Sequence, residues 1–233
     1  DGAHCERSPM YHGLLLEHVL HALAVAQAAR VRAPRSLVDA LSTTASRALA
    51  PLDVWTHPDG EIALLGDAVF GVAQPPARLR SYAAALGVHR STLGETGLVR
   101  STGHARLECG ELVLIASLGG PSPPHQPGHA HCDALAFELS AGAQRVVTDT
   151  GVYEYVPGER RDRARATSSH ATLEVGGAEQ MEFFAGHRVG GRPRVEITSA
   201  APGRAVEAVC AGWATPRTVH RRRFEVVAGP ARL

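Results

Sequence analysis

Two histidines separated by a single residue, His129 and His131, are the side chains of this sequence best placed to act together chemically. They follow a segment rich in proline and glycine (119–128) and precede a run in which apolar and polar residues alternate (133–140). In an extended backbone, side chains two positions apart point to the same face. A neutral imidazole binds metal ions and also serves as an acid or a base near pH 7. The pair therefore predicts one shared site, with a loop carrying two solvated histidines as the alternative.

Two residues farther along the chain extend this pair into a predicted metal site. Asp149 ends the second of two predicted strands joined by a turn at Ala141-Gly142, and His170 directly precedes another apolar run. A tight hairpin would return Asp149 to the neighbourhood of His131. Two imidazoles and one carboxylate, with an open position for water, suit zinc. The alternative is that Asp149 begins a turn and His170 is a half-buried strand residue, and the spacing alone leaves both open.

The cupin barrel is another fold that presents an H-x-H pair, and the next glutamate tests that alternative. Cupins place this glutamate closer to the second histidine than Glu138 lies here. The alternation of the run also predicts that Glu138 lies on the outer face of its strand. A cupin site is therefore not favoured.

The four cysteines, Cys5, Cys109, Cys132 and Cys210, are widely spaced and form no C-x-x-C pair. Four reduced thiols are the favoured interpretation, and two disulfides are the alternative. Cys132 would point away from the histidines in a strand, so we expect it to pack in the core.

The composition is that of an ordinary globular protein: 233 residues, 44% of them hydrophobic, with a net charge of +1. This charge gives no reason to expect a nucleic acid or an anionic membrane as the main partner. No apolar run reaches the length of a membrane span, and no secretion signal is visible. The chain runs from Asp1 to Leu233, and we expect it to be a fragment of a longer protein. The sequence determines neither its compartment nor its oligomeric state.

Residues 1–88 have mainly helical patterns. Ser8 and Pro9 predict a helix start, with an apolar stripe continuing to about Val31, and Ser36 predicts the cap of a second helix through Leu49. A short hairpin is expected over 55–65, a loop over 67–76 and a third helix over 77–86. Paired helices with short connections indicate a helical bundle or a toroid.

The pattern changes near residues 87–93, where we place a domain boundary. From there, short β-rich runs separated by glycine-containing turns indicate an antiparallel sandwich. The predicted strands are 97–106, 111–118, 133–140, 145–150, 171–175, 194–199, 205–211 and 221–227.

Several motifs together resemble the heparinase II/III-like polysaccharide lyases. They are DGAHCERSPMYH at the N-terminus, the acidic loop Leu65-Gly66-Asp67-Ala68, GHAHCDALAFEL, VVTDTGVYEY, and an arginine-rich loop followed by SSHATLEV. The resemblance implies an α+β multidomain fold. Its parts would be the end of an (α/α) toroid over residues 1–88 and a truncated antiparallel β-sandwich over residues 89–233, with the active cleft between them.

The resemblance also implies roles for individual residues. His131, Asp149 and His170 match the positions that hold zinc, Tyr11 matches the catalytic tyrosine, and His129 matches a histidine that assists binding or catalysis. We further expect substrate contacts from Glu6, His12, Tyr155, Arg161 and Arg165.

For the arginines the alternative is a solvated charged loop, and for Tyr11 it is a helix residue that packs on its neighbours. Two departures from the family pattern stand out. Ala171 replaces the usual asparagine after the third metal ligand, and the upstream residue that pairs with the substrate carboxylate has no match in this chain.

The activity implied by the resemblance is β-elimination on an acidic, uronate-containing glycan, either heparin- or heparan-sulfate-like, alginate-like or related. A non-catalytic, metal-stabilised glycan-binding module is the alternative. The resemblance favours a bacterial periplasmic or secreted protein, with a cytoplasmic one as the alternative.

Overall fold

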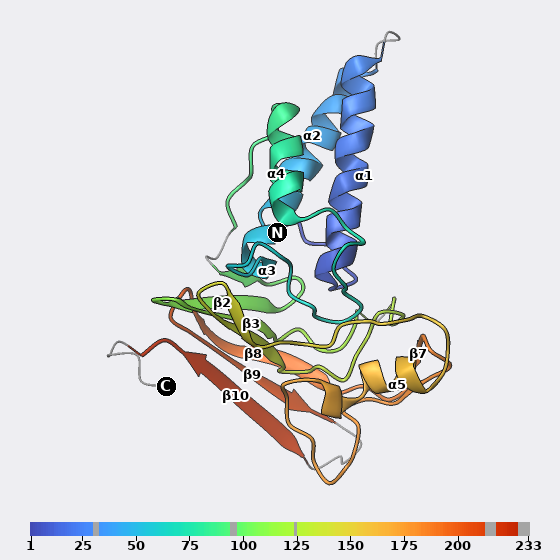
Figure 1. Ribbon diagram of the computed structural model, residues 1–233, viewed down its shortest axis with the longest axis vertical. Coiled ribbons are helices and arrows are strands. Elements are labelled where there is room, and N and C mark those ends of the chain that lie inside the picture. The colour runs from blue at the N-terminus through green and yellow to red at the C-terminus, as the bar shows by residue number, and fades with distance from the viewer. Residues whose placement is uncertain (30–32, 94–96, 124, 213–217, 228–233) are drawn as a thin grey trace.

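A computed structural model describes residues 1–29, 33–93, 97–123, 125–212 and 218–227. Helices lie above two β-sheets (Figure 1). The long helices are α1 (Pro9–Ala28), α2 (Arg35–Leu49) and α4 (Pro76–Ala85), and the short α3 (Leu52–Trp55) lies at their base. No helix of the described residues is both long and apolar enough to cross a membrane.

The start of α1 confirms the prediction made from Ser8 and Pro9. The Ser8 side chain caps the helix by accepting a hydrogen bond from the Tyr11 amide, and Pro9 occupies the first turn. Leu16, Leu20 and Leu23 are fully buried against α2 and α4, whereas Val31, the predicted end of the apolar stripe, lies outside the described residues.

The predicted cap of the second helix is wrong, because α2 already begins at Arg35 and Ser36 lies inside its first turn. Pro34 precedes the helix with φ −54° and ψ 134°, an extended conformation that the proline ring favours. Its carbonyl oxygen accepts the amide hydrogens of Leu37 and Val38.

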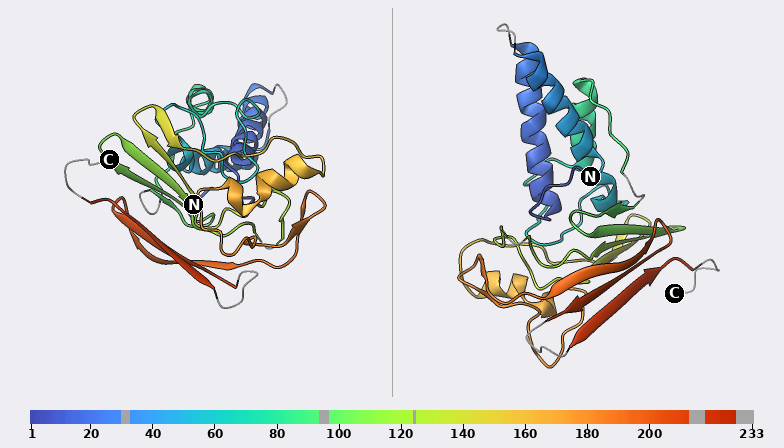
Figure 2. Two further views of the ribbon diagram at one scale, coloured as in Figure 1. Left: turned by 60° about the horizontal axis from the view of Figure 1, so that its bottom comes forward. Right: turned by 180° about the vertical axis from the view of Figure 1, so that it is seen from behind.

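Two antiparallel sheets form the lower part of the molecule, one above the other (Figure 2). The first has five strands in chain order, and the second has three in the order β10-β9-β8, while β6 and β7 form a separate hairpin. The strands are β1 (Leu98–Val99), β2 (His104–Cys109), β3 (Leu112–Ser117), β4 (Phe137–Ala141), β5 (Gln144–Val147), β6 (Phe183–Phe184), β7 (Arg188–Val189), β8 (Arg194–Ala201), β9 (Ala205–Ala211) and β10 (Val219–Glu225).

The five-stranded sheet is the middle layer of the molecule. On β3, Ala116 packs toward Ala208 and Cys210 of the other sheet, whereas Val113 and Ile115 pack toward the helical layer. This follows from the two-residue period of a strand, which sends alternate side chains to opposite faces. The α+β class with antiparallel sheets packed as a sandwich is confirmed.

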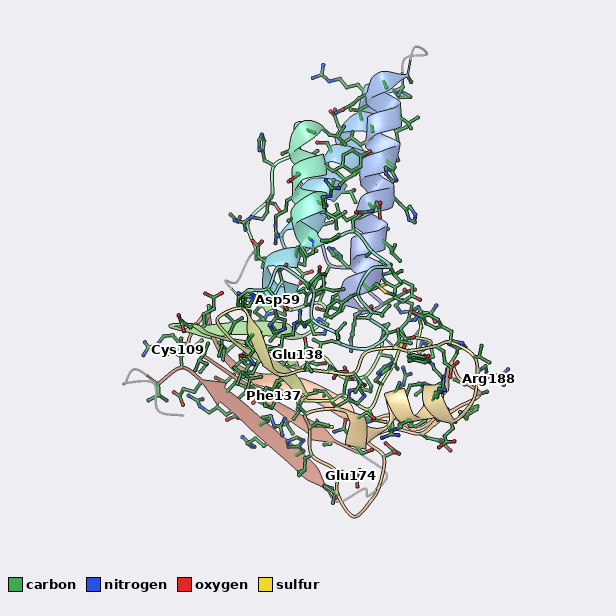
Figure 3. All side chains as sticks on the ribbon, viewed as in Figure 1. Asp59, Cys109, Phe137, Glu138, Glu174 and Arg188 are labelled. Atoms are coloured by element: carbon green, nitrogen blue, oxygen red, sulfur yellow. The ribbon has the colours of Figure 1, made fainter. Side chains whose placement is uncertain are left out.

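Glu138 lies on the face of β4 opposite Phe137, away from the sandwich core as predicted, but the helical layer covers this face and Glu138 is fully buried. Figure 3 shows its position on β4, below the helical layer. Its carboxylate accepts hydrogen bonds from the amides of Leu64 and Asp149 and lies 3.2 Å from His57 Nε2. Glu138 thus joins the 55–65 segment to the end of β5.

The segment 158–175 also departs from prediction. Instead of an arginine-rich loop, residues Glu159–Arg165 form helix α5, followed by a 3-10 turn η1 (Thr167–Ser169). The acidic residues of α5 lie in its first turn and its last arginines in its final turn, which suits the helix dipole. The predicted strand 171–175 is absent from this fully described segment, where only Val175 makes an isolated bridge.

All four cysteines are free, as the favoured interpretation predicted, and Cys132 is buried beside Ala130 and Met181.

Trp55 lies at the junction between the helical layer and the middle sheet. Its fully buried ring contacts His12 of α1, with centroids 4.9 Å apart, and His104 of β2, with centroids 5.5 Å apart. Burial lowers the pKa of His12 to about 4 and that of His104 to about 3. Both rings are therefore neutral in the folded protein at neutral pH.

These two histidines should make folding sensitive to acid. An unfolded histidine titrates near pH 6.5, so between about pH 6.5 and pH 4 the unfolded state binds protons that the folded state does not, and stability falls with pH. We expect His104→Gln to reduce the loss of unfolding free energy between about pH 7 and pH 5 by roughly 1–2 kcal/mol. Urea unfolding at both pH values measures this, with the exposed His18→Gln as the control. An unchanged pH slope in His104→Gln would contradict the assignment.

Candidate functional site

The carboxylate of Asp67 connects the helical layer to the segment that carries the histidine pair. It is fully buried, and its Oδ1 lies 2.8 Å from Nε2 of His131 while its Oδ2 lies 3.0 Å from Nδ1 of His129. Arg161 donates to both oxygens, with Nη2 2.8 Å from Oδ2. The two histidines therefore converge on one carboxylate, although the segment that carries them is a loop and not part of a strand.

Backbone contacts of the 65–68 loop hold Asp67 in position. The Ser8 hydroxyl donates to the Asp67 carbonyl oxygen at 2.7 Å, so the start of α1 holds the loop in place. Gly66 has a φ of +58°, and a Cβ there would lie only 3.1 Å from the carbonyl oxygen of His129. Glycine allows both the left-handed backbone and this close approach.

The hydrogen bonds that Asp67 accepts keep its carboxyl group ionised. Burial alone would raise the pKa of this carboxyl, but the hydrogen bonds from His129, His131 and Arg161 outweigh burial and hold the pKa well below its usual range. An ionised carboxylate only accepts hydrogen bonds. Nδ1 of His129 and Nε2 of His131 must therefore both carry a hydrogen.

A group of polar side chains surrounds His129 at the base of α1. The rings of Tyr11 and His129 have centroids 4.0 Å apart, and the hydroxyls of Tyr11 and Tyr155 share a hydrogen bond of 3.1 Å. Oε2 of Glu6 lies 3.4 Å from Nε2 of His129. The structure thus brings together four of the predicted site residues: Glu6, Tyr11, His129 and Tyr155.

Tyr155 differs from an ordinary tyrosine. Burial, its hydrogen bond with Tyr11 and the negative charge of Asp67 raise the pKa of Tyr155 well above its usual range, despite the opposing charge of Arg161. Tyr155 therefore keeps its proton and can donate a hydrogen bond to the Tyr11 oxygen.

The three predicted metal ligands also lie close together. The rings of His131 and His170 have centroids 5.2 Å apart, and Asp149 Oδ2 lies 2.7 Å from Nδ1 of His170. Burial lowers the pKa of His131, whereas the charge and hydrogen bond of Asp149 overcome burial and raise the pKa of His170.

One nitrogen of each ring remains without a hydrogen-bond partner: Nδ1 of His131 and Nε2 of His170, both buried. Buried polar atoms normally have partners, and a neutral imidazole nitrogen is a metal ligand, so these two bare nitrogens could hold a cation. Within the described ranges, however, no group of three or more His, Cys, Asp or Glu side chains has the arrangement of a metal site. Asp149 instead orients His170 through Nδ1, as carboxylates do behind metal-bound histidines.

Two of the predicted substrate contacts, Arg161 and Arg165, are fully buried. Arg161 donates to the carbonyl oxygens of Gly186 and Gly128, and Arg165 donates to that of Ala130, so both hold the loop that carries the histidine pair. This position does not support a direct contact with substrate.

His12 is likewise fully buried, with Nε2 2.7 Å from the carbonyl oxygen of Ala48. It packs in the core between the layers, and its predicted role as a substrate contact has no support in the structure.

Besides Asp67, two further acidic residues of this region were not predicted as site residues. Asp133 is buried, and burial raises its pKa to about 7, with His170 and Asp149 close enough for their charges to act on it. Glu138 holds the amide of Asp149 at 2.8 Å. Asp133 could have been predicted from its place two residues after His131. Glu138 could not, because its burial depends on the helical layer.

Comparison with known proteins shows the family to which the chain belongs. The sequence model of the heparinase II/III-like C-terminal domain matches residues 92–233, which is more than half of the chain. The chain therefore belongs to the heparinase II/III-like family. No match was found among curated proteins.

Solved structures show the same fold. A heparan sulfate lyase from Pedobacter heparinus shares 18% sequence identity with this chain at a TM-score of 0.64, covering 96% of this chain and 36% of its own. A heparinase III structure shares 17% identity at a TM-score of 0.67, covering 96% and 38%. This chain thus spans little more than a third of the length of these proteins.

The pairing of Asp67 with Arg161 should be essential to stability. Replacing Asp67 by Asn leaves the guanidinium of Arg161 buried without a counter-charge, which typically costs about 3–5 kcal/mol. We expect Asp67→Asn to lower the unfolding free energy by roughly this amount in urea titrations. Asp53→Asn is the matched control, because Asp53 forms exposed pairs with Arg80 and Arg90 and should lose only about 1 kcal/mol or less. Equal losses in both variants would contradict the role of Asp67.

Proposed function

We propose that this chain is part of a polysaccharide lyase that cleaves an acidic, uronate-containing glycan by β-elimination. The observation that carries the proposal is the placement of the Tyr11 hydroxyl beside His129 and Tyr155 at the base of α1. Membership of the heparinase II/III-like family supports it. Heparin- or heparan-sulfate-like glycans are the first candidates for the substrate, because the similar structures include a heparan sulfate lyase, and alginate-like glycans are a second class.

The reaction needs one group that first takes a proton and then returns one. Tyr11, as a phenolate, would remove the proton from C5 of the uronate, which lies next to the carboxylate. The C5–H electrons form the C4–C5 double bond, the bond from C4 to the glycosidic oxygen breaks, and the departing oxygen takes the proton from Tyr11. A positioned acid or base of this kind typically contributes about 10²–10⁴-fold to the rate.

The neighbours of Tyr11 suit this role. Tyr155 keeps its proton, so its hydroxyl can stabilise a Tyr11 phenolate with a hydrogen bond. The His129 ring lies against that of Tyr11 and is anchored by Asp67 through Nδ1, which leaves Nε2 directed toward Glu6. We assign His129 to binding the substrate or its developing negative charge, and Glu6 to orienting that imidazole.

We also propose that His131 and His170 hold a zinc ion through their bare nitrogens, with Asp149 as the third group of the site. The two buried, unpartnered ring nitrogens fit such an ion. A bound zinc would supply positive charge to the sandwich face of the cleft. Asp149 holds the His170 ring in the orientation that keeps Nε2 free.

We further propose that α1, α2 and α4 are the last helices of an (α/α) toroid over residues 1–88, preceding a sandwich domain over residues 89–233. The limited share of the similar proteins that this chain spans supports this division. A non-catalytic glycan-binding module remains the second candidate, because the group that would neutralise the substrate carboxylate has no counterpart among the assigned residues.

Replacement of Tyr11 tests the proposal. The purified protein should release unsaturated uronate, seen as rising ultraviolet absorbance, from a heparin, heparan sulfate or alginate sample and not from a neutral glucan. Tyr11→Phe should lower kcat by about 10²-fold or more without changing stability. Tyr82→Phe is the matched control, because Tyr82 lies on α4 against His21. Cleavage that survives in Tyr11→Phe would overturn the assignment, and binding without cleavage would favour the module.

A further inference from the structure

Helix α5 carries two arginines on its buried face and two on its exposed face. Arg161 and Arg165, four positions apart, are buried and bind Asp67 and the histidine loop. Arg160 and Arg163, three positions apart, lie on the solvent-exposed side. Residues three or four apart share one face of a helix. The second pair is therefore free of the structural role that the first pair performs.

The exposed pair lines a cavity of about 440 Å³ at the edge of the sandwich, beside the helix labelled α5 in Figure 1. Its volume lies within the usual range of small-ligand pockets, about 300–1,000 Å³. The side chain of Tyr153 is 75% exposed there, and the guanidinium of Arg160 lies 5.2 Å from the centre of its ring. The full lining is Thr150, Tyr153, Arg160, Arg163, Ala164 and Ser169.

The charge of this cavity is not compensated from within. Its lining contains two arginines and no carboxylate. In the part of the chain that the structure describes, no acidic side chain forms an ion pair with Arg160 or Arg163. The hydroxyl of Ser169 donates to the Arg163 carbonyl oxygen at 2.6 Å, which ties the end of the helix to the pocket wall.

The chemistry of the lining defines its ligand. Guanidinium groups bind sulfate and carboxylate through paired hydrogen bonds. An exposed aromatic ring offers a flat apolar surface with a polar tip, against which the C–H face of a sugar ring can pack. Thr150 adds a hydroxyl that can bind sugar oxygens. Together these groups match a sugar that carries an anionic substituent.

We propose that Tyr153, Arg160 and Arg163 form a subsite for a sulfated or carboxylated sugar of an acidic glycan. Thr150 and Ser169 directly adjoin Asp149 and His170 in sequence, so the subsite lies next to these two residues of the proposed metal site. The inference deepens the proposed function by naming where the glycan is held away from Tyr11. It concerns binding and is independent of whether the glycan is cleaved.

Calorimetric titration of the purified Tyr11→Phe protein, in which turnover is slowed, tests the subsite. Three probes are used: a heparin-derived oligosaccharide, an unsulfated oligomannuronate and a neutral cello-oligosaccharide. We expect the Arg160→Ala/Arg163→Ala variant to bind at least one anionic probe about tenfold or more weakly, and the neutral probe to show no dependence on these residues. If the variant loses affinity for the heparin-derived probe alone, the group bound by the arginines is sulfate. If it loses affinity for both the heparin-derived probe and the oligomannuronate, the group is carboxylate.

The matched control is Arg194→Ala/Arg221→Ala, which removes the same charge from exposed strand positions on β8 and β10. It should change the Kd by less than about twofold. Tyr153→Ala should weaken binding and Tyr153→Phe should retain it, which separates the ring face from the hydroxyl.

An unchanged Kd in the Arg160→Ala/Arg163→Ala variant, an equal loss in the control, or no binding of either anionic probe by the parent protein would overturn the subsite. Absence of cleavage in the wild-type protein, together with binding that depends on Arg160 and Arg163, would leave the subsite standing and remove the lyase. The two failures are therefore distinguishable.

Discussion

The site depends on one buried carboxylate that comes from a loop of the helical layer and reaches into the sandwich. Asp67 holds His129, His131 and Arg161 at once. A buried ion pair contributes little net stability compared with apolar packing, but losing one partner is costly. The main contribution of Asp67 is therefore a geometry rather than net stability. Here that geometry is the orientation of two imidazoles, one facing the Tyr11 group and one facing His170.

The two carboxylates at the histidines act in a complementary way. Asp67 accepts from Nε2 of His131, and Asp149 accepts from Nδ1 of His170, so opposite nitrogens of the two rings remain bare. Glu138 supports this arrangement from below by holding the Asp149 amide. The helical layer that buries Glu138 therefore also helps to position Asp149 and, through Asp149, the ring of His170. Substitutions that disturb the packing of the helical layer on the middle sheet should therefore change the positions of Asp149 and His170 as well as the stability of the core.

Patterns local in sequence predicted the fold well, because caps and alternation report directly on nearby backbone and burial. The Ser8 cap and the β3 alternation are examples. The same reasoning placed Glu138 on the correct face of its strand but missed its burial, because alternation separates the two faces of a strand without telling what covers each. It also missed that Arg161 and Arg165 turn inward, since their partners lie on distant loops. The convergence of His129 and His131 was predicted, but its cause, Asp67, lies more than sixty residues earlier in the chain and no local pattern reveals it.

The most direct test of this account is nitrogen-15 NMR of the histidine rings in mildly alkaline solution, without metal and after one equivalent of zinc. The account predicts that His131 carries its hydrogen on Nε2 and His170 on Nδ1, and that zinc shifts the resonances of the two bare nitrogens while those of the exposed His18 stay unchanged. The same tautomer in both rings, or no response to zinc, would contradict the claim that Asp67 and Asp149 prepare these histidines for a cation.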